Sequence, residues 1–341
     1  MKVAVLGASG LVGRTMLEVL STRSWVDEEP RLLVSERSAG TLIRYGDREL
    51  ACAAVEARNL AGLDVLLCSA GREAARKWAP VAAAGGALVV DNSSCFRLDQ
   101  DVPLVVPEVN QPPVDRCRES GGLVIANPNC STIQMAVFAG VLAREFGLKE
   151  LHAVTLQAVS GAGLPALEQW EQEKADPEAP AGTVFPRRMA GNVLPAIGPA
   201  LPGGDYEEEA KVRRELRRIL PGGKNLEVTC TAVRVPVHTG HSVALRCLLE
   251  EPVDMERIRD ALRRQPGLIL APDPGDFATP LEVAGSTRVH VGRLRPDPGN
   301  PHGLLAWVVA DNLLKGAAWN AVQIVESCLG LAGPGSETGH P

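Results

Sequence analysis

The sequence lacks features that define several classes of protein. Aromatic residues make up only 4% of its 341 residues, so the hydrophobic cores must be built from aliphatic side chains. No apolar run approaches the roughly 18 residues that a membrane-spanning helix needs. The apolar run at the N-terminus ends at Gly7, too early for a signal peptide, and predicts a buried strand. We therefore expect a globular protein with no membrane partner.

Excess positive charge and paired cysteines are also missing. The net charge of −6 argues against a nucleic-acid partner. The eight cysteines form no C-x-x-C pair and have no metal-ligand spacing with histidine, so we predict no metal site. In a chain of this length they indicate reduced thiols and a cytoplasmic location.

The opening of the chain predicts a dinucleotide-binding turn. "KVAVLGASGLVG" combines a short strand, a glycine-rich turn and the start of a helix, with glycines at Gly7, Gly10 and Gly13. In this fingerprint the first glycine permits the tight turn, the second admits a pyrophosphate, and the third lets the helix pack on the strand. The N–H groups at the start of the helix would bind the phosphates.

Strands and helices alternate through the first third of the chain. "RLLVS", "DVLLCSA", "ALVVDNS" and "GLVIANPN" read as strands, and "REAARKWAPVAAA" reads as a helix. This alternation predicts an α/β Rossmann fold with a doubly wound, mostly parallel sheet. Ligands bind such sheets at the carboxyl ends of the strands.

The pattern changes after residue 147. "ELHAVTLQAVSGAG" and four later segments read as long strands, "YEEEAKVRRELRRIL" reads as a charged helix, and residues 176–205 read as an extended excursion. We predict an α+β catalytic and dimerisation domain with a mixed, largely antiparallel sheet. The expected division is residues 1–128 with 313–331 for the Rossmann domain, 129–312 for the second domain, and 332–341 for a disordered tail.

Cys130 is the first candidate for chemistry. It follows an Asn-Pro-Asn turn at the end of a predicted strand and opens the apolar helix "STIQMAVFAGVLAREF". A helix N-terminus stabilises a thiolate, and its N–H groups could also stabilise an oxyanion. The pattern alone leaves open whether Cys130 is a nucleophile or a packing residue. A packing role is the simpler interpretation for Cys52, Cys68, Cys117, Cys230, Cys247 and Cys328, while Cys95, in a strand-end loop, stays open.

A thiol nucleophile needs an acid/base partner, and histidine is the usual one. His340 lies in the tail, and His152 and His290 lie within strand patterns. "RVPVHTGHS" presents His238 and His241 beside a Gly turn between two strands. The residues alone do not choose between these two.

The motifs "NPNCSTIQM", "LQAVSGAG", "RVPVHTGHS" and "DNLLKGAAWN", with "GASGLVG" at the start, resemble the aspartate-β-semialdehyde dehydrogenase family over nearly the whole chain. The resemblance implies an oxidoreductase that uses NADPH to convert aspartyl-4-phosphate into aspartate semialdehyde and inorganic phosphate. This reaction serves lysine (diaminopimelate), methionine and threonine biosynthesis. The resemblance also implies an NADP-binding Rossmann domain and a catalytic domain that forms a homodimer, with a tetramer as the alternative.

The resemblance also implies roles for particular residues. Cys130 would be the nucleophile that forms an acyl thioester, and His241 the acid/base residue. Arg234 would hold the substrate α-carboxylate, and Glu208 would meet its amino group. On the residues alone, Glu208 and Lys211 are most simply an ion pair on a solvated helix. The remaining substrate contacts implied are Gln157, which orients the substrate, Asn129, and the phosphate ligands Lys211 and Arg97.

For the cofactor, the resemblance implies contacts along the glycine-rich turn and after the second strand. An arginine after that strand favours NADP, whereas the carboxylate of Glu36 could bond a ribose 2′-hydroxyl, so the choice between NADP and NAD stays open. The implied cofactor contacts are Gly7, Ser9, Gly10, Leu11, Val12, Arg37, Ser38, Ser160, Gly161 and Asn312.

Three other functions fit parts of the pattern. An N-acetylglutamyl-phosphate reductase would share the Cys chemistry and the Rossmann domain, but Glu208 favours a substrate with a free amino group. A non-catalytic paralogue would have lost its nucleophile or base, yet Cys130 and His241 are both present. A Cys/His hydrolase would not need glycines at a strand–helix turn.

Overall fold

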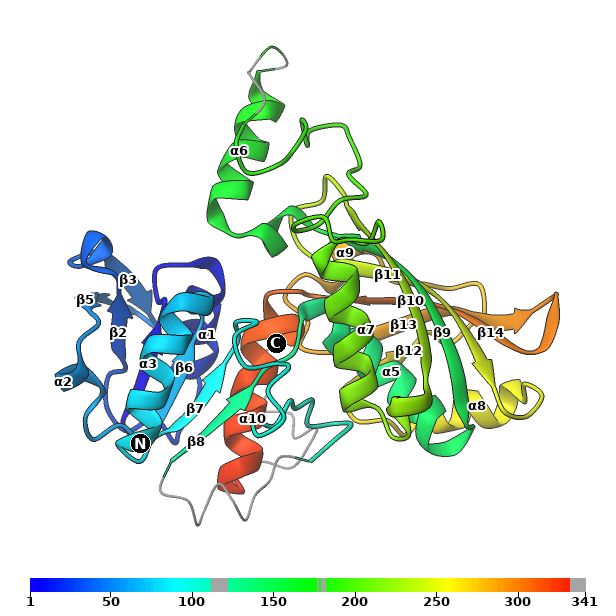
Figure 1. Ribbon diagram of the computed structural model, residues 1–341, viewed down its shortest axis with the longest axis horizontal. Helices are drawn as coiled ribbons and strands as arrows, with labels where there is room; N and C mark the ends of the chain where they lie inside the picture. Colours follow the sequence, from blue (N-terminus) through cyan, green and yellow to red (C-terminus); the bar gives the residue numbers. More distant parts are fainter. Residues whose placement is uncertain (112–121, 177, 179–181, 332–341) are drawn as a thin grey trace. The chain divides into compact units, whose positions relative to one another are not determined.

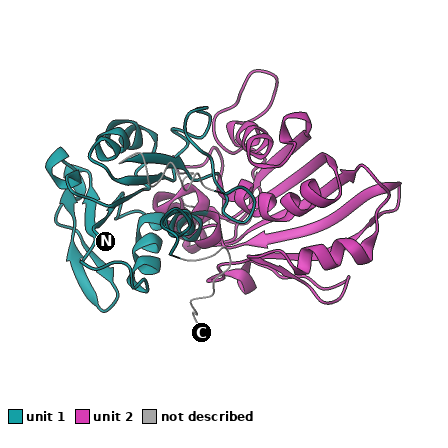
Figure 2. Cartoon of the chain, turned by 90° about the horizontal axis from the view of Figure 1, so that it is seen from below, with its two compact units in different colours: residues 1–128, 317–341 teal, residues 129–316 magenta. Residues whose placement is uncertain are grey.

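A computed structural model describes residues 1–111, 122–176, 178 and 182–331 of the chain (Figure 1). Contacts divide the chain into two units, Met1–Pro128 with Ala317–Pro341, and Asn129–Gly316 (Figure 2). The expected disordered tail at 332–341 and Cys117 lie outside the described residues. Over the described ranges, no helix is both long and apolar enough to cross a membrane.

Unit 1 is built on a parallel sheet whose six strands run in the order β5-β2-β1-β6-β7-β8. The chain passes from β1 to β2 on one side and later returns to β6 on the other side of β1. Ligands bind at such a reversal of strand order. The strands are β1 (Val3–Leu6), β2 (Arg31–Val34), β5 (Ala53–Ala54), β6 (Val65–Cys68), β7 (Leu88–Asp91) and β8 (Leu123–Ala126).

The helices of unit 1 pack aliphatic faces on this sheet. Buried Leu6, Leu33, Leu66 and Val89 belong to one hydrophobic cluster on the strands, as the shortage of aromatic residues requires. Among its described residues, unit 1 has the helices α1 (Leu11–Ser21), α2 (Ala57–Leu60), α3 (Arg72–Ala84) and α10 (Trp319–Leu329). It also has a short hairpin of β3 (Leu42–Tyr45) and β4 (Arg48–Ala51).

Unit 2 is built on a mixed sheet with the strand order β10-β9-β11-β14-β13-β12. The pairs β9–β10 and β12–β13 are parallel, and the other three pairs are antiparallel. Together with the parallel sheet of unit 1, this confirms the predicted fold class. The strands are β9 (Leu148–Gln157), β10 (Glu227–Arg234), β11 (His241–Leu249), β12 (Leu268–Leu270), β13 (Val289–Asp297) and β14 (Asn300–Ala310).

Helices cover one face of the unit 2 sheet. The central helix α5 (Cys130–Glu145) packs on β9, β11, β13 and β14, while α7 (Glu207–Ile219) packs on β10 and α8 (Met255–Arg263) on β12. Side chains along β10 alternate between buried and largely exposed, as expected for a sheet with one covered face. The other helices described in this unit are α6 (Leu164–Ala175) and the short α9 (Pro280–Val283).

Two features of unit 2 differ from the sequence prediction. The strand expected to continue through "VSGAG" ends at Gln157, and Val159–Ala162 forms a 3₁₀ turn. Gly163 follows with φ +89°, outside the strand region, and caps α6. Helix α6 itself was not predicted, because its apolar residues do not gather into a clear stripe.

Candidate active site

Cys130 is the first residue of α5. Asn129 caps the helix, and its side-chain oxygen accepts the N–H groups of Ser131 at 2.9 Å and Thr132 at 3.3 Å. The predicted position of Cys130 in the first helical turn is therefore confirmed. Cys130 is half-buried, whereas the helix behind it is buried from Ser131 to Leu142. A thiolate here would benefit from the positive end of the helix dipole.

A glycine in a π-helical turn packs against Cys130. The turn is η4 (Leu314–Ala318), and a Cβ placed on its Gly316 would lie 3.0 Å from the Cβ of Cys130. Any larger residue at 316 would therefore press on the cysteine. We did not single out Gly316 from the sequence; its place in "DNLLKGAAWN" was the only signal.

The ends of three neighbouring strands bring Gln157, Arg234 and His241 together. Gln157 ends β9 and pairs with Arg234, which ends the parallel strand β10. His241 begins β11, whose Ser242 pairs with Leu156 next to Gln157. The sheet register thus places an amide, a guanidinium and an imidazole at one edge of unit 2.

His241 is fully buried and neutral. Its Nδ1 accepts the backbone N–H of Ala158 at 3.1 Å, so the ring proton of the neutral imidazole lies on Nε2. Burial, and secondarily the charge of Arg234, lower the pKa of His241 well below its ordinary value. Among the described residues, Nε2 has no hydrogen-bond partner. His238 is instead exposed and contacts the Thr239 hydroxyl, so only His241 joins this cluster.

Arg234 lies beside His241 across the backbone of Gly161. A Cβ on Gly161 would lie 2.8 Å from Nη1 of Arg234 and 3.0 Å from Nε2 of His241. Arg234 is only 5% exposed, and its Nη1 donates to the carbonyl of Ala158 at 2.8 Å. Burial lowers the pKa of Arg234, while the negative charges of Glu208 and Cys130 act in the opposite direction. Both of those groups therefore lie near the guanidinium.

Glu208 joins α7 to this cluster. Its Oε1 accepts hydrogen bonds from the side-chain amides of Asn129 at 2.7 Å and Gln157 at 3.1 Å. Lys211 Nζ lies 3.9 Å from Glu208 Oε2 and bonds more closely to Glu207, at 3.0 Å. The ion pair of the simpler interpretation is therefore present at 3.9 Å, but Glu208 is only 7% exposed, so its carboxylate is buried and not on a solvated face.

The neighbouring carboxylate has a different environment. Glu209 accepts the backbone N–H groups of Tyr206 at 2.7 Å and Ala232 at 3.0 Å. It therefore closes the N-terminus of α7 instead of facing the cysteine helix. Glu208 thus faces Asn129 and Gln157, whereas Glu209 faces Tyr206 and Ala232.

A cavity of about 460 Å³ opens onto Arg234. Its wall is formed largely by the excursion after α6 and by the start of α7. Among the described residues of the lining, Arg234 is the charged one. The cavity is lined by Ala162, Thr183, Val184, Phe185, Pro186, Ala196, Ile197, Gly198, Tyr206 and Arg234.

Ser160 and Asn312 bond to each other instead of pointing outward. Asn312 Nδ2 donates to the Ser160 hydroxyl at 3.0 Å, and Asn312 Oδ1 accepts the N–H of Gly240 at 2.9 Å. The residue that opens the following turn is Asp311, which accepts the N–H groups of Leu313 and Leu314. Asn312 therefore precedes η4 and α10 in the chain, and its side chain is directed at Ser160 and Gly240.

In unit 1 the glycine-rich turn is shaped for a phosphate. Gly7 has φ +89°, and a Cβ on Gly13 would lie 2.2 Å from the carbonyl oxygen of Gly7. Gly10 is the N-cap of α1, and no side chain caps the helix. The turn lies against Ser69 and Ala70 after β6, at the reversal of strand order. The backbone N–H groups there fit a dinucleotide pyrophosphate.

The other predicted residues of unit 1 lie at strand ends. Arg37 and Ser38 are in the 3₁₀ turn η1 (Glu36–Ser38) that follows β2, and Arg37 is exposed. Arg97 lies in the loop after β7, is 8% exposed, and donates from Nη2 to the carbonyl of Asn92 at 2.8 Å. Across the residues described, no group of three His, Cys, Asp or Glu side chains could hold a metal.

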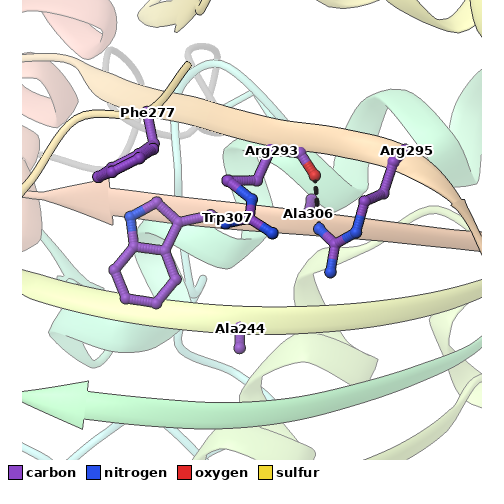
Figure 3. A pocket seen from close by; sticks show the side chains of 6 residues that line it. All are labelled: Ala244, Phe277, Arg293, Arg295, Ala306 and Trp307. Atoms are coloured by element: carbon purple, nitrogen blue, oxygen red, sulfur yellow. Dashed lines mark hydrogen bonds between the residues drawn. The ribbon is translucent and has the colours of Figure 1, made fainter. Parts of the chain in front are cut away.

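A second hollow, of about 340 Å³, lies on the unit 2 sheet. Figure 3 shows it between the aromatic rings of Phe277 and Trp307 and the side chains of Arg293 and Arg295, with Ala244 and Ala306 on the strands. The Trp307 indole donates to the carbonyl of Ala278, and Phe277 is 49% exposed. The hollow thus presents aromatic and cationic groups together.

Comparison with known proteins first defines the class. Residues 2–116 match the family described as "Semialdehyde dehydrogenase, NAD binding domain", and residues 139–315 match "Semialdehyde dehydrogenase, dimerisation domain". The protein is therefore an oxidoreductase of the semialdehyde dehydrogenase class, with a nicotinamide-dinucleotide domain and a dimerisation domain.

Whole-chain relatives narrow this class. The aspartate-semialdehyde dehydrogenase of Aquifex aeolicus is 42% identical, over 95% of this chain and 97% of that protein. The crystal structure of aspartate semialdehyde dehydrogenase II from Vibrio cholerae, complexed with ASA, superposes with a TM-score of 0.90 at 40% identity, over 96% of this chain and 98% of that chain. This chain belongs to the aspartate-semialdehyde dehydrogenase family.

Proposed function

We propose that the protein reduces L-aspartyl-4-phosphate to L-aspartate-4-semialdehyde with NADPH, through a thioester on Cys130. The observation that carries this proposal is the position of Cys130 at the start of α5, in one cluster with Glu208, Arg234 and His241. The whole-chain relatives named as aspartate-semialdehyde dehydrogenases support the choice of substrate. The product would serve lysine, methionine and threonine biosynthesis.

In the first step the Cys130 thiolate attacks the acyl carbon of the substrate. The bond from carbon to the phosphate oxygen breaks, phosphate leaves with the electron pair, and a thioester remains. Forming the thioester divides one difficult reduction into two easier steps. We assign Lys211 and Arg97 to the departing phosphate, because cations stabilise the charge that develops on it.

The rest of the cluster orients the substrate. The guanidinium of Arg234, facing the 460 Å³ cavity, suits a bidentate contact with the α-carboxylate. Glu208 would hold the α-amino group with the oxygen lone pairs that Asn129 and Gln157 leave available. This pairing also favours an aspartyl over an N-acetylglutamyl substrate, whose nitrogen carries no charge.

His241 would act as the proton-bearing group at the reacting carbonyl. Its proton is held on Nε2, which can donate to the carbonyl oxygen as that oxygen gains negative charge. The bound nicotinamide would supply the hydride that reduces the thioester. The resulting alkoxide then re-forms a carbonyl and expels the Cys130 thiolate, so the reduction needs no further proton.

The glycine-rich turn of unit 1 would hold the dinucleotide. Gly7, Ser9, Gly10, Leu11 and Val12 form the backbone that surrounds the pyrophosphate at the start of α1. Ser160, Gly161 and Asn312 would lie on the nicotinamide side.

The turn after β2 would select between NADP and NAD. We assign Arg37 and Ser38 to a 2′-phosphate, with Glu36 as the group that could admit NAD. Replacing Arg37 with Ala should weaken NADP binding and leave NAD binding unchanged, as measured by isothermal titration of each dinucleotide. Equal losses for both would remove Arg37 from this role.

We further infer that a second copy of the chain covers the hollow of Figure 3. The hollow lies within residues 139–315, which match a dimerisation domain, and it combines exposed Phe277 with Trp307. Replacing Trp307 with Glu should shift the molecular mass in solution towards that of a monomer. An unchanged mass would place the interface elsewhere, and sedimentation would also separate a homodimer from a tetramer.

The function is tested by phosphate-dependent reduction of NADP, and of NAD, with aspartate semialdehyde. Wild type should turn over, and Cys130→Ser should lose turnover while retaining dinucleotide affinity. Undiminished activity in Cys130→Ser would refute the mechanism. Faster turnover of N-acetylglutamate semialdehyde would favour the related reductase, and dinucleotide binding without any turnover would favour a non-catalytic paralogue.

A further inference from the structure

Besides Glu208, a second carboxylate of α7 bonds to Asn129, the residue before Cys130. This carboxylate belongs to Glu215. Its Oε2 accepts the N–H of Asn129 at 2.6 Å, and Glu215 is only 1% exposed. In sequence it stands within "RRELRR", where it resembles a surface residue of a charged helix. Burying a carboxylate is unfavourable unless its oxygens are hydrogen-bonded, and the Asn129 N–H provides such a bond.

Glu215 and Glu208 hold Asn129 from one face of α7. They are seven residues apart, or two helical turns, so their side chains point in the same direction. Glu215 takes the backbone N–H of Asn129, and Glu208 takes its side-chain NH₂ group. The remaining side-chain oxygen of Asn129 caps α5. Its backbone carbonyl accepts the N–H of Ile133 at 2.9 Å, so all four polar groups of Asn129 are fixed at the same time.

This arrangement determines where Cys130 stands. The carbonyl of Asn129 forms the peptide bond to Cys130, so a rotation of Asn129 would both move the thiol and misalign the N–H groups of the first turn. We propose that Glu215 is a positioning residue that orients the Cys130 thiolate by fixing the backbone of Asn129. The proposal rests on the proposed function for the role of the thiolate, but the Cys130 titration used below requires no turnover.

The test compares Glu215→Gln with Glu215→Leu. Both variants remove the charge and have similar size, but only Gln keeps an oxygen that can accept the Asn129 N–H. The measurement is the rate of iodoacetamide alkylation against pH, read by mass spectrometry on the peptide that carries Cys130. A loosened helix N-terminus stabilises a thiolate less well. The pH at which the alkylation rate of Cys130 reaches half its maximum should therefore be roughly half a pH unit higher in Glu215→Leu than in Glu215→Gln.

Turnover adds a second readout. Glu215→Leu should have a kcat about tenfold or more below that of Glu215→Gln, because a misplaced nucleophile slows the chemical step. The KM values should differ little, since Arg234 and Glu208 remain to bind substrate. If Glu215→Leu does not fold, Glu215→Asp takes its place, because it retains the charge but withdraws the acceptor by one methylene. Its alkylation midpoint should then exceed that of wild type.

Glu173 offers a matched control. Glu173 lies on α6, away from α7, and is also 1% exposed. Like Glu215 it accepts backbone N–H groups, from Met189 at 2.7 Å and Ala190 at 2.9 Å. The Gln and Leu variants at 173 should have the same Cys130 titration as each other. The proposal would be overturned if Glu215→Gln and Glu215→Leu had the same Cys130 alkylation midpoint and the same kcat. It would also be overturned if the Gln and Leu variants at 173 differed from each other in these two quantities as much as the variants at 215 do. Loss of activity in Cys130→Ser concerns the proposed function alone, so the two ideas fail separately.

Discussion

The imidazole of His241 accepts the backbone N–H of Ala158 through Nδ1, at 3.1 Å. Ala158 follows the end of β9, so the strand that supplies Gln157 also fixes the tautomer of the histidine. A protonated ring would direct a second N–H at the N–H of Ala158, which is unfavourable. The geometry and the lowered pKa of His241 therefore agree that the ring is neutral in the folded protein.

A first prediction concerns stability in acid. The folded-state pKa of His241 lies well below the unfolded value near ~6.5, so the unfolded state binds more protons between the two values. The free energy of unfolding contributed by His241 is therefore complete above about pH 6.5 and decreases as the pH falls below it. His241→Gln retains an acceptor for Ala158 but does not titrate. Urea unfolding of both proteins at pH 7 and pH 5 should show wild type losing up to about 2 kcal/mol more than the variant. If the free energies of unfolding of wild type and His241→Gln differed by the same amount at pH 7 and at pH 5, His241 would not be neutral in the folded protein.

A second prediction concerns the backbone between Arg234 and His241. Gly161→Ala would place a methyl group within 3.0 Å of both side chains and force them to move. Because small displacements of catalytic groups are costly, kcat should fall by roughly 10- to 100-fold. Gly275→Ala is the control, since no heavy atom lies within 4 Å of its added Cβ. Normal kinetics in Gly161→Ala would show that the two side chains do not need this spacing.

A third prediction concerns the buried guanidinium. Arg234→Lys retains a positive charge but loses the planar pair of donors that matches a carboxylate. The KM for aspartate semialdehyde should rise by about 10- to 100-fold, as expected for the loss of roughly 1.5–3 kcal/mol of charged hydrogen bonding. Affinity for the dinucleotide should stay unchanged. A variant whose defect appears only in dinucleotide affinity would exclude Arg234 from carboxylate binding.

A fourth prediction isolates the cofactor turn. A Cβ on Gly10 would approach no heavy atom closer than the Gly7 carbonyl oxygen, at 3.5 Å, so Gly10→Ala should fold normally. The methyl group would nevertheless occupy the space into which a pyrophosphate must come. Fluorescence titration should show at least about tenfold weaker NADP binding with an unchanged melting temperature. If affinity is preserved, the pyrophosphate does not approach this turn.

Local patterns predicted much of the fold from the sequence. The glycine spacing, the parallel strands of unit 1 and the start of α5 at Cys130 depend on neighbouring residues, so they could be inferred without coordinates. Helix α6 lacks a clear apolar stripe and was missed. The orientation of α7 was also beyond local reasoning. Glu208 and Glu209 are adjacent in sequence, but only the packing of α7 turns one towards Asn129 and the other towards Ala232.

The same limitation explains what was missing from the predicted site. Glu215 stands among arginines and has the sequence environment of a solvated residue. Gly316 and the wall of the Arg234 cavity become relevant only through contacts between segments that are distant in sequence. Residues of this kind carry no motif, because their role depends on what the fold places beside them.

The most direct measurement is the half-reaction without phosphate. Wild type is mixed with aspartate semialdehyde and NADP, NADPH is followed by absorbance, and the peptide that carries Cys130 is then weighed by mass spectrometry. The account predicts a burst of at most one NADPH for each active site, an aspartyl group on Cys130, and continued turnover only after phosphate is added. Sustained turnover without phosphate, or a burst of equal size in Cys130→Ser, would contradict it.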